Sequence, residues 1–350
     1  GQGCPRSFLE CAPPNRRAQS PHQQEIFVSS GQRAWFAQTM NPRMPRRDFL
    51  RTATVSLAAL GLAGSPVAAI EPFKRPGTPR LQLSLAAYSF RQFFKDGSDA
   101  RAPEPAADKR IDLFQFIDYC ADHGCAGTEL TSYYFPKDLD EAYLLKLRRR
   151  AFLRGVAVSG TAVGNTFTHP RGDKRDDELA RVRKWVDHAA VLGAPHIRVF
   201  AGNLQKGSTA AEARTLSIAA LEECGEYAGR KGIFLGLENH GGIVADPKDL
   251  LDIVRAVKSP WVGINLDTGN FHTDDPYADV ASCVPYAVNV QVKSEIQKRG
   301  EKKEPADLAR LVKILRNDNY QGFVALEYEA AEDPWQAVPP LLKRLRELMG

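Results

Sequence analysis

Three short apolar runs of this chain each end in an acidic residue. The runs are residues 233–238, 262–267 and 322–327, and their last residues are Glu238, Asp267 and Glu327. A strand that is buried on both faces reads as a nearly continuous apolar run, as in parallel sheets covered by helices. An acid that closes such a run stands at the carboxyl end of its strand, where α/β folds build their sites. The pattern therefore predicts a parallel α/β fold in which these acids converge.

The rest of the chain repeats one unit, a short apolar run followed by a longer amphipathic segment. We expect strands at residues 81–90, 127–130, 156–163, 196–200, 233–238, 262–267, 288–293 and 322–327. Helices are expected at 110–123, 139–154, 176–192, 209–231 and 305–316, and at three Asp-Pro pairs, 246–247, 275–276 and 333–334. Asp is a favourable N-cap and Pro suits the first helical turn, so each pair predicts a helix start.

Eight strand–helix units are the number that closes a (β/α)8 barrel, whose typical length is ~250 residues. Strands that alternate with helices favour a parallel sheet. A doubly wound open sheet is the alternative, but no Gly-rich phosphate loop follows the first predicted strand. The sequence therefore predicts a single TIM-barrel domain over residues 70–350, with a polar insert at 95–108.

Residues 44–69 have the layout of an export signal, with a basic region, a short apolar run and a small-residue cleavage site after Ala69. The apolar run is too short and too rich in Gly and Ala to span a bilayer, so no stable membrane anchor is expected after cleavage. An amphipathic first helix of the domain is the alternative. The basic region resembles a twin-arginine signal, which implies export to the periplasm; its residues are Arg46-Arg47-x-Phe49-Leu50-Arg51.

The basic charge of the chain belongs to its first part. Residues 1–69 hold eight Lys or Arg and three Asp or Glu, which accounts for the whole net charge of +5. A neutral domain from residue 70 onward has no electrostatic footprint for nucleic acid or anionic membranes. Residues 1–43 show no periodicity, and we expect them to be disordered or to lie upstream of a start at Met40 or Met44.

Four cysteines follow residue 70, and they are Cys120, Cys125, Cys224 and Cys283. None stands in a CxxC pair or another close metal-binding spacing, so a thiolate metal site is not expected. Export would permit a disulfide, but the sequence does not indicate a pair.

Polar residues at the expected strand ends are the candidates for a site, because TIM barrels build their sites there. They are Glu129, Asn165, Arg198, Glu238, His240, Asp267, Asn270, Gln291, Lys293 and Glu327. Three acids in one cavity repel one another unless they are protonated, paired or metal-bound, and a divalent cation is the simplest solution. An all-oxygen ligand set favours Mg²⁺ or Mn²⁺, with Zn²⁺ or Co²⁺ as alternatives. The expected ligands are Glu238, Asp267, Gln291 and Glu327, and the expected substrate contacts are Glu129, Asn165, Arg198, Asn270 and Lys293.

Several of these residues also have a structural interpretation. Gln291 is equally suited to hydrogen bonding inside the barrel, and Glu129 to a position behind the site. His240 is an acid or base, a substrate contact, or a structural histidine. The aromatic residues 133–135 either stack on a substrate or pack on the barrel rim.

Four strand-end motifs resemble those of the sugar phosphate isomerase/epimerase, or xylose-isomerase-like, barrel superfamily, over most of residues 81–348. The motifs are Leu237-Glu238-Asn239-His240, Leu266-Asp267-Thr268-Gly269-Asn270, Val290-Gln291-Val292-Lys293 and Leu326-Glu327-Tyr328-Glu329. The resemblance implies that the two glutamates, the aspartate and a histidine on the seventh strand bind a metal. This chain has Gln291 in place of that histidine, and Asn270 where many members have another.

The resemblance further implies a divalent-metal-dependent isomerase or epimerase of keto sugars. The ion would polarise the carbonyl and acidify the neighbouring C–H. We expect Glu238 and Glu327, on opposite sides of the ring of strands, to act as base and acid, with His240 as a third candidate. Protonation on the other face gives an epimer, and protonation of the next carbon gives an isomer. Loss of a β-oxygen substituent is an elimination, so a lyase acting on 3-keto glycosides is an alternative.

Two further functions compete with these. A nuclease of the same superfamily needs several zinc ions, many histidines and a basic groove, and the neutral domain argues against it. An exported, non-catalytic sugar-binding barrel stays open. The expected partner is a small-molecule carbohydrate without phosphate, because no Arg or Lys cluster marks a phosphate pocket. The sequence leaves open whether the chain forms a homo-oligomer.

Overall fold

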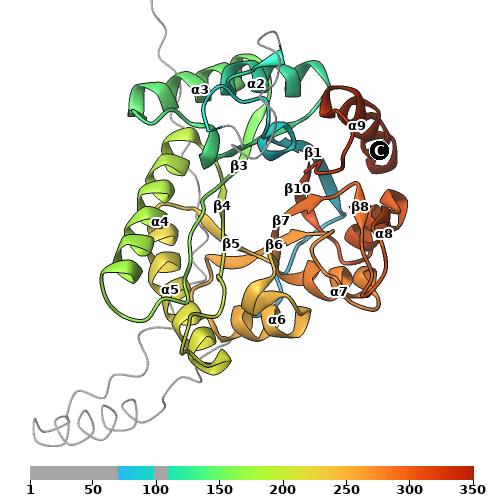
Figure 1. Cartoon of the computed structure of the whole chain (residues 1–350). Helices are drawn as coiled ribbons and strands as arrows, with labels where there is room; N and C mark the ends of the chain where they lie inside the picture. The colour runs from blue at the N-terminus through green and yellow to red at the C-terminus, as the bar shows by residue number, and fades with distance from the viewer. Residues whose placement is uncertain (1–69, 98–108) are drawn as a thin grey trace, which may run out of the picture. The chain divides into compact units, whose positions relative to one another are not determined.

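Eight parallel strands form a closed barrel in the computed structural model, which describes residues 70–97 and 109–350 (Figure 1). The order around the ring is β1, β10, β7, β6, β5, β4, β3, β2. The strands are β1 (Arg80–Ala86), β2 (Gly127–Thr131), β3 (Ala157–Ala162), β4 (His196–Val199), β5 (Phe234–Glu238), β6 (Val262–Asp267), β7 (Ala287–Val292) and β10 (Gln321–Leu326). This topology confirms the predicted (β/α)8 TIM barrel.

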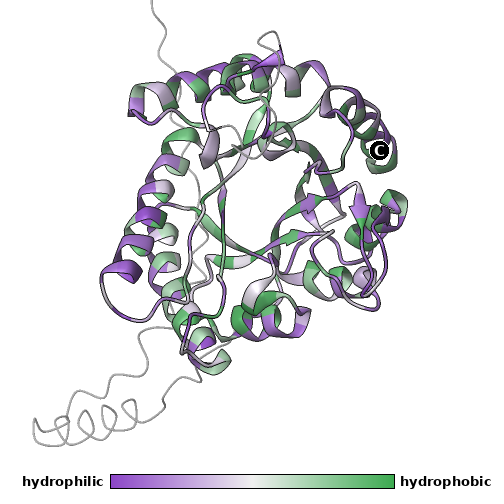
Figure 2. Ribbon diagram, in the orientation of Figure 1, coloured by the Kyte–Doolittle hydropathy of each residue, from purple (hydrophilic) through white to green (hydrophobic). Residues whose placement is uncertain are grey.

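Helices surround the ring of strands (Figure 1). Those in the described residues are α2 (Leu113–Asp122), α3 (Glu141–Leu153), α4 (Asp173–Leu192), α5 (Ala210–Arg230), α6 (Pro247–Ala256), α7 (Pro276–Cys283), α8 (Leu308–Asn317) and α9 (Pro334–Met349). Apolar residues such as Leu147 on α3 and Val254 on α6 are fully buried, whereas hydrophilic residues cover much of the outer helix surfaces (Figure 2). The amphipathic pattern of each helix therefore covers the outside of the sheet.

Three helices begin at the Asp-Pro pairs. The carboxylates of Asp246, Asp275 and Asp333 each accept a hydrogen bond from a backbone N–H in the first turn of the helix that follows. Proline stands next in each case, at a position whose N–H has no partner inside the helix. The helix starts predicted at these pairs are confirmed.

The first strand is shorter than predicted. It ends at Ala86, and the next residues form the 3₁₀ helix η1 (Ala87–Phe90). The Ser89 hydroxyl donates to the carbonyl of Leu326 at 3.3 Å and accepts from the N–H of Tyr328 at 2.9 Å, so this turn is tied to the end of β10. The apolar run continues past the strand because Phe90 packs against the Trp335 ring at 4.8 Å between centroids.

A short antiparallel hairpin follows β7, and it was not predicted from the sequence. Its strands are β8 (Glu295–Ile296) and β9 (Glu304–Pro305). The last residue of the hairpin, Pro305, is also the first residue of the helix expected at 305–316. The helix α8 begins only after its N-cap Asp307, whose carboxylate accepts from the N–H of Arg310 at 3.0 Å.

The interior of the barrel is polar in part. Ser84 on β1 and Ser159 on β3 share a hydrogen bond of 2.7 Å between their hydroxyl oxygens, and both residues are fully buried. Because β2 separates these strands, the contact crosses the interior, past Gly127 of β2. A side chain at Gly127 would place its Cβ 2.7 Å from the Cβ of Ser159. Polar side chains thus fill space that aliphatic layers occupy in most TIM barrels.

Some predictions fall on residues 1–69 and 98–108, which lie outside the described ranges. They are the leader, the signal peptide and most of the polar insert. Within the described ranges, the four cysteines are buried and carry free thiols. No helix in those ranges combines the length and the hydrophobicity that a membrane crossing requires.

Candidate functional site

The three acids that close the apolar runs lie at the carboxyl-terminal mouth of the barrel. Glu238 ends β5, Asp267 ends β6 and Glu327 directly follows β10, and their exposed fractions are 3%, 0% and 5%. On the ring, β6 and β7 separate β5 from β10 on one side and four strands separate them on the other. Glu238 and Glu327 therefore come from strands that lie three positions apart on the eight-strand ring.

A lysine ammonium group lies among these acids. Nζ of Lys293, which follows β7, is 3.1 Å from Oδ2 of Asp267 and 2.7 Å from Oε2 of Glu327, and it also pairs with Glu329. In the described part of the chain, Oδ2 of Asp267 accepts no hydrogen bond and faces this ammonium. Burial alone lowers the pKa of Lys293, but the three carboxylates raise that pKa well above its ordinary value.

Glu238 pairs with a second cation. Oε2 of Glu238 is 2.9 Å from Nε of Arg198 on β4, and Oε1 accepts a hydrogen bond from the Asn270 amide at 3.1 Å. The Arg198 guanidinium also donates to the carbonyl of Val163 at 3.2 Å and lies 4.0 Å from the ring centroid of Phe200. Burial alone lowers the pKa of Arg198, but Glu238 raises it above its ordinary value.

Below the acids, four polar side chains form a closed cycle of hydrogen bonds. Gln291 Nε2 donates to Glu129 Oε1 at 2.6 Å, and Asn265 Nδ2 donates to Gln291 Oε1 at 2.6 Å. Asn289 Nδ2 donates to Asn265 Oδ1 at 2.8 Å and to Glu129 Oε2 at 2.9 Å. All four residues are buried. Both the oxygen and the nitrogen of the Gln291 amide are therefore hydrogen-bonded inside the barrel, as the structural interpretation of this residue predicts.

Burial shifts the protonation of the carboxyl groups. Burial, with repulsion from Asp267 and Glu327, holds the pKa of Glu238 well above its ordinary value, although Arg198 opposes the shift. Burial raises the pKa of Asp267 to about 7, against the opposing effect of Lys293. Burial and Glu327 raise the pKa of Glu129 to about 7. Clusters of shifted acids in a cleft are typical of functional sites.

A pocket of about 150 Å³ opens above the acids. It is lined by Tyr88, Tyr133, Arg198, Phe200, Glu238, His240, Lys293, Glu327 and Glu329. The His240 ring lies 4.5 Å from that of Phe200, and burial lowers the pKa of His240, so its imidazole is neutral at neutral pH. The turn after His240 requires glycine at residue 242, where φ is +58° and a Cβ would lie 2.5 Å from the carbonyl of Gly202.

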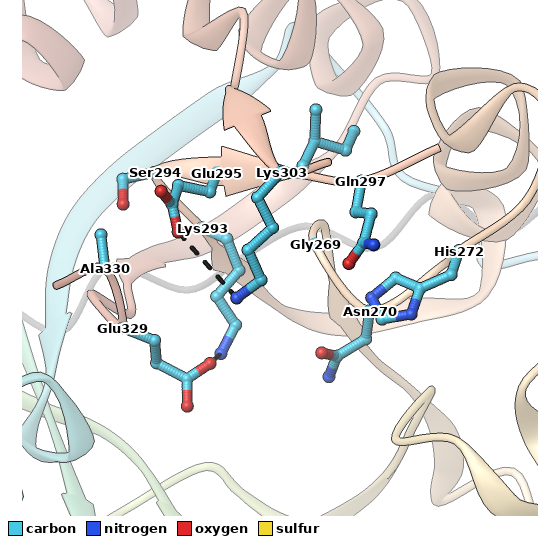
Figure 3. Close-up of a pocket in the computed structure, with 11 residues that line it drawn as sticks. Gly269, Asn270, His272, Lys293, Ser294, Glu295, Gln297, Lys303, Glu329 and Ala330 are labelled. Carbon is cyan, nitrogen blue, oxygen red and sulfur yellow. Dashed lines mark hydrogen bonds and ion pairs between the residues drawn. The ribbon is translucent and has the colours of Figure 1, made fainter. Parts of the chain in front are cut away.

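A second pocket of about 130 Å³ adjoins the first, and Figure 3 draws the residues that line it. Lys293 and Glu329 line both pockets, and Figure 3 shows their side chains meeting across from Asn270 and His272. Lys303, from the hairpin, pairs with Glu295 at 3.9 Å on the same wall.

The predicted site residues fall into four groups. Glu238, Glu327, His240, Arg198 and Lys293 line the first pocket, and Asn270 lines the second. Asp267, Gln291 and Glu129 lie beneath, and Asn165 lies apart from both linings. The Asn165 amide donates to the carbonyl of Phe200 at 2.8 Å and accepts from its N–H at 2.9 Å, so it joins two loops.

Several residues of the site were not among the predicted site residues. Asn265 and Asn289 each precede a predicted residue by two positions, so the two-residue period of a strand placed them on the same face and was a usable signal. Asn239 was also missed, and its amide clamps the backbone of Asp267 with two hydrogen bonds of 2.8 and 2.9 Å. Of the aromatic residues 133–135, Tyr133 lines the pocket, whereas Tyr134 and Phe135 are buried in the core. Tyr88 and Phe200 fall within the predicted strands 81–90 and 196–200, and they gave no signal because only polar residues at strand ends were candidates.

The predicted metal ligands are occupied by other partners. Gln291 bonds to Asn265 and Glu129, Glu238 pairs with Arg198, and Lys293 lies between the remaining acids. Across residues 70–97 and 109–350, no three or more His, Cys, Asp and Glu side chains gather in a way that could hold a metal ion. In this arrangement the residues do not fit a divalent ion.

Comparison with known proteins places this site in context. A family model described as "Xylose isomerase-like TIM barrel" matches residues 117–348. The 3-oxo-isoapionate decarboxylase of Pectobacterium atrosepticum is 27% identical over 190 residues, which are 54% of this chain and 59% of that protein. The match thus spans less than two thirds of that relative.

Solved structures share the fold. The 3-keto-D-glucoside 4-epimerase of E. coli has a TM-score of 0.56 at 18% identity, with 77% of this chain and 100% of that chain covered. The IOLI protein, solved with a bound zinc atom, has a TM-score of 0.59 at 15% identity, with 76% of this chain and 96% of that chain covered. At these identities the likeness establishes the fold alone.

Proposed function

This chain belongs to the xylose isomerase-like TIM barrel family, and we propose that it catalyses the isomerisation or epimerisation of a keto sugar. The proposed reaction moves a proton on the carbon next to the carbonyl. One observation supports it most: two buried carboxylates, Glu238 and Glu327, line one pocket with the cationic Lys293, and their strands stand on either side of β7.

Removal of a proton next to a carbonyl needs a base, a positive group for the developing oxyanion and an acid that returns a proton. We assign the acid to Glu238, because burial holds the pKa of this carboxyl well above its ordinary value, even though the Arg198 guanidinium opposes that shift. Glu327 is the base. The C–H bond breaks, its proton passes to Glu327, and its electron pair moves toward the carbonyl to form an enediolate. A proton from Glu238 to the same carbon then gives the epimer. A proton to the former carbonyl carbon gives the isomer, provided that the hydroxyl proton of the α-carbon also passes to the former carbonyl oxygen.

The lining of the pocket supports a carbohydrate as the substrate. Carboxylate, guanidinium and imidazole groups offer hydrogen bonds to sugar hydroxyls, and the rings of Tyr88, Tyr133 and Phe200 offer apolar faces to C–H groups. The names of the decarboxylase relative and the E. coli epimerase both refer to carbohydrates with a keto or oxo group at carbon 3. A 3-keto sugar is therefore the substrate class that we propose to test first.

The adjoining pocket supports a second candidate, an epimerisation or elimination on a 3-keto glycoside. The first pocket would hold the oxidised ring, and the second, which shares Lys293 and Glu329, would hold the group attached to it. Elimination would use the same first step, loss of the proton to Glu327, followed by departure of the β-oxygen substituent.

A divalent metal, Mg²⁺ or Mn²⁺, is the alternative source of positive charge that the sequence predicts. The IOLI protein, which shares the fold, was solved with a bound zinc atom. Glu238, Asp267 and Glu327 would have to give up Arg198 and Lys293 before they bound one. No step of the proposed reaction is therefore assigned to a metal.

Solvent exchange tests the proposal. The protein is incubated in deuterium oxide with keto sugars and 3-keto glycosides, and loss of the α-proton signal is followed by NMR. Wild type should exchange the proton of at least one sugar, and Glu327→Gln should lower that rate by about 10²–10⁴-fold. Glu301→Gln, at an exposed position of the hairpin loop, is the control. Sugar binding without any exchange by wild type would contradict the proposal and identify a binding module.

We also propose export through residues 44–69, a small-molecule carbohydrate as partner, and no nucleic-acid partner. Replacing both Arg46 and Arg47 with Lys should leave the full-length precursor in the cytoplasmic fraction, because the paired arginines are the recognised feature. An unchanged periplasmic fraction would rule out the twin-arginine route.

Sedimentation of the purified protein would determine whether it forms a homo-oligomer.

A further inference from the structure

We infer that Lys293 is a catalytic residue whose ammonium group binds the substrate carbonyl, the part that a metal ion was expected to play. This inference rests on the proposed isomerase or epimerase function, and it goes further by naming the group that stabilises the enediolate. Three independent features of the site support it.

The first feature is the position of the ammonium. Nζ of Lys293 lies among the carboxylates of Asp267, Glu327 and Glu329, at the point where the two pockets meet. The residue is 7% exposed, so the charge acts with little screening by water. A cation held there before substrate arrives does not have to be reorganised during the reaction.

The second feature is that the neighbouring groups are committed elsewhere. Gln291, the residue that stands in place of the expected histidine, donates to Glu129 and accepts from Asn265, both at 2.6 Å. Glu238 is held by Arg198 at 2.9 Å. The residues predicted as metal ligands thus support a buried polar cycle and three ion pairs, one between Glu238 and Arg198 and two that Asp267 and Glu327 make with Lys293. Lys293 supplies the positive charge between Asp267 and Glu327.

The third feature is that one partner of Lys293 can be exchanged for substrate. An ammonium group has three N–H donors, and here three carboxylates surround it. Asp267 and Glu327 are buried, whereas the side chain of Glu329 is 33% exposed and lines both pockets. The substrate carbonyl takes the place of Glu329, so one N–H points at the oxygen that becomes negative.

The chemical step then balances within the protein. Glu327 takes the α-proton, the C–H pair forms the carbon–carbon double bond, and the carbonyl π pair moves onto oxygen. The oxyanion is stabilised by the hydrogen bond from Lys293, which keeps its proton. Protonation of carbon by Glu238 reverses the electron flow, and solvent restores the two carboxyl groups.

Metal dependence and substitution at Lys293 together test the inference. Wild type is dialysed against EDTA, its binding of Mn²⁺ is measured by equilibrium dialysis, and α-proton exchange is followed with and without the ion. We expect no stoichiometric Mn²⁺ binding and unchanged exchange after EDTA. Lys293→Met should lower exchange by about 10²–10³-fold, as loss of one oxyanion donor does. Lys293→Arg, which keeps the charge, should recover part of the rate.

Lys298→Met is the matched control, because Lys298 pairs with Glu304 at 3.8 Å on the hairpin and lines neither pocket. Circular dichroism and thermal melting check that each variant folds. A constructive variant, Gln291→His combined with Lys293→Ala, frees Asp267 and Glu327 and adds an imidazole, and it should gain Mn²⁺ binding. If this double variant folds but does not bind Mn²⁺, the space between Asp267 and Glu327 is not a cation site, and the inference that Lys293 takes the place of a metal ion is contradicted.

The outcomes separate the two proposals. Stoichiometric Mn²⁺ binding by wild type, with exchange abolished by EDTA, overturns the role of Lys293 and leaves the isomerase proposal intact. If Lys293→Met exchanges the α-proton at the wild-type rate while Glu327→Gln is inactive, the role of Lys293 is likewise overturned and the isomerase proposal is left intact. Absence of exchange by wild type with every sugar, with and without Mn²⁺, overturns the proposed function and this inference with it.

Discussion

Nζ of Lys293 and Oε2 of Glu327 lie 2.7 Å apart, although 34 positions separate the two residues in the chain. They meet because β7 and β10 are neighbours in the ring and each residue directly follows its strand. Both side chains are less than a tenth exposed, so solvent screens their attraction only weakly. A cation and a carboxylate are therefore held in contact at the mouth of the barrel before any ligand binds.

The pair of Glu238 with Arg198 gives a stability prediction. Glu238→Leu should lower the free energy of unfolding by about 3–5 kcal/mol, because Arg198 stays charged and would be buried without its partner. Glu238→Gln should lose less, since its amide oxygen still accepts from the guanidinium. Urea unfolding measures both. Glu226→Leu is the control: its pair with Arg230 has side chains 78% and 60% exposed, and surface pairs contribute about 0–1 kcal/mol. If Glu238→Leu and Glu226→Leu lower the free energy of unfolding by the same amount, the Glu238–Arg198 pair does not contribute more than a surface pair.

Stability should fall as pH rises from about 5 to 7. Burial raises the pKa of Asp267 and of Glu129 to about 7 in the folded protein, whereas in the unfolded chain both carboxyl groups titrate near their ordinary values of 3.8 and 4.5. In that window the folded state binds more protons than the unfolded state, so raising the pH favours unfolding. Above about pH 7.5 the curve should be flat with respect to these groups.

Glu129→Gln isolates one of the two groups. Its stability curve should be shallower between pH 5 and 7 by about 1.4 kcal/mol per pH unit, the value for one proton. Urea midpoints at half-unit pH intervals provide the measurement, and Glu301→Gln on the surface should keep the wild-type slope. A stability curve that does not fall across this window, and that Glu129→Gln leaves unchanged, would show that the two acids are already ionised in the folded protein.

The cycle beneath the acids gives a third prediction. Gln291→Leu keeps the volume but leaves Glu129 Oε1 and Asn265 Nδ2 without their hydrogen bonds. We expect a loss of about 2–4 kcal/mol in the free energy of unfolding, since each buried unsatisfied group costs about 1–3 kcal/mol. Gln321→Leu, which removes an exposed hydrogen bond to the carbonyl of Pro76, should cost about 1 kcal/mol. If Gln291→Leu does not change the free energy of unfolding, the cycle of hydrogen bonds is not maintained in solution.

Tyr133 gives a prediction about substrate binding. Its ring is 38% exposed and lines the first pocket, so it offers a surface on which a sugar face can rest. Tyr133→Ala should raise KM by about 3–10-fold, the factor expected for loss of an aromatic contact, with kcat nearly unchanged. Tyr133→Phe should keep the wild-type KM. Leu204→Ala, at another exposed apolar residue outside both pockets, is the control. A loss confined to kcat would place Tyr133 in the chemical step instead.

Much of the barrel follows from local pattern. The runs that end in Glu238 and Asp267 coincide with the carboxyl ends of β5 and β6. Asp246, Asp275 and Asp333 mark helix starts, because an N-cap acts on the turn that immediately follows it. Where the pattern was wrong, a tertiary contact was responsible: the apolar run of β1 continues into η1 because Phe90 is buried against α9.

The partners of the site residues did not follow from local pattern. Gln291 and Glu129 are 162 positions apart, and their hydrogen bond crosses the interior of the barrel. Nothing in the neighbourhood of Gln291 indicates whether its amide faces a metal or another side chain. The residues next to Lys293 in the sequence likewise do not indicate that its ammonium pairs with Asp267 and Glu327.

The sequence alone determined that this chain closes a parallel barrel and that Glu238, Asp267 and Glu327 stand at its mouth, because strand period and strand ends are written in consecutive residues. Only the tertiary structure decided that these acids are paired with Arg198 and Lys293 and that Gln291 is locked into the cycle beneath them. The reason is geometric: such pairings depend on strand order around the ring and on side-chain reach across it, which no stretch of consecutive residues encodes.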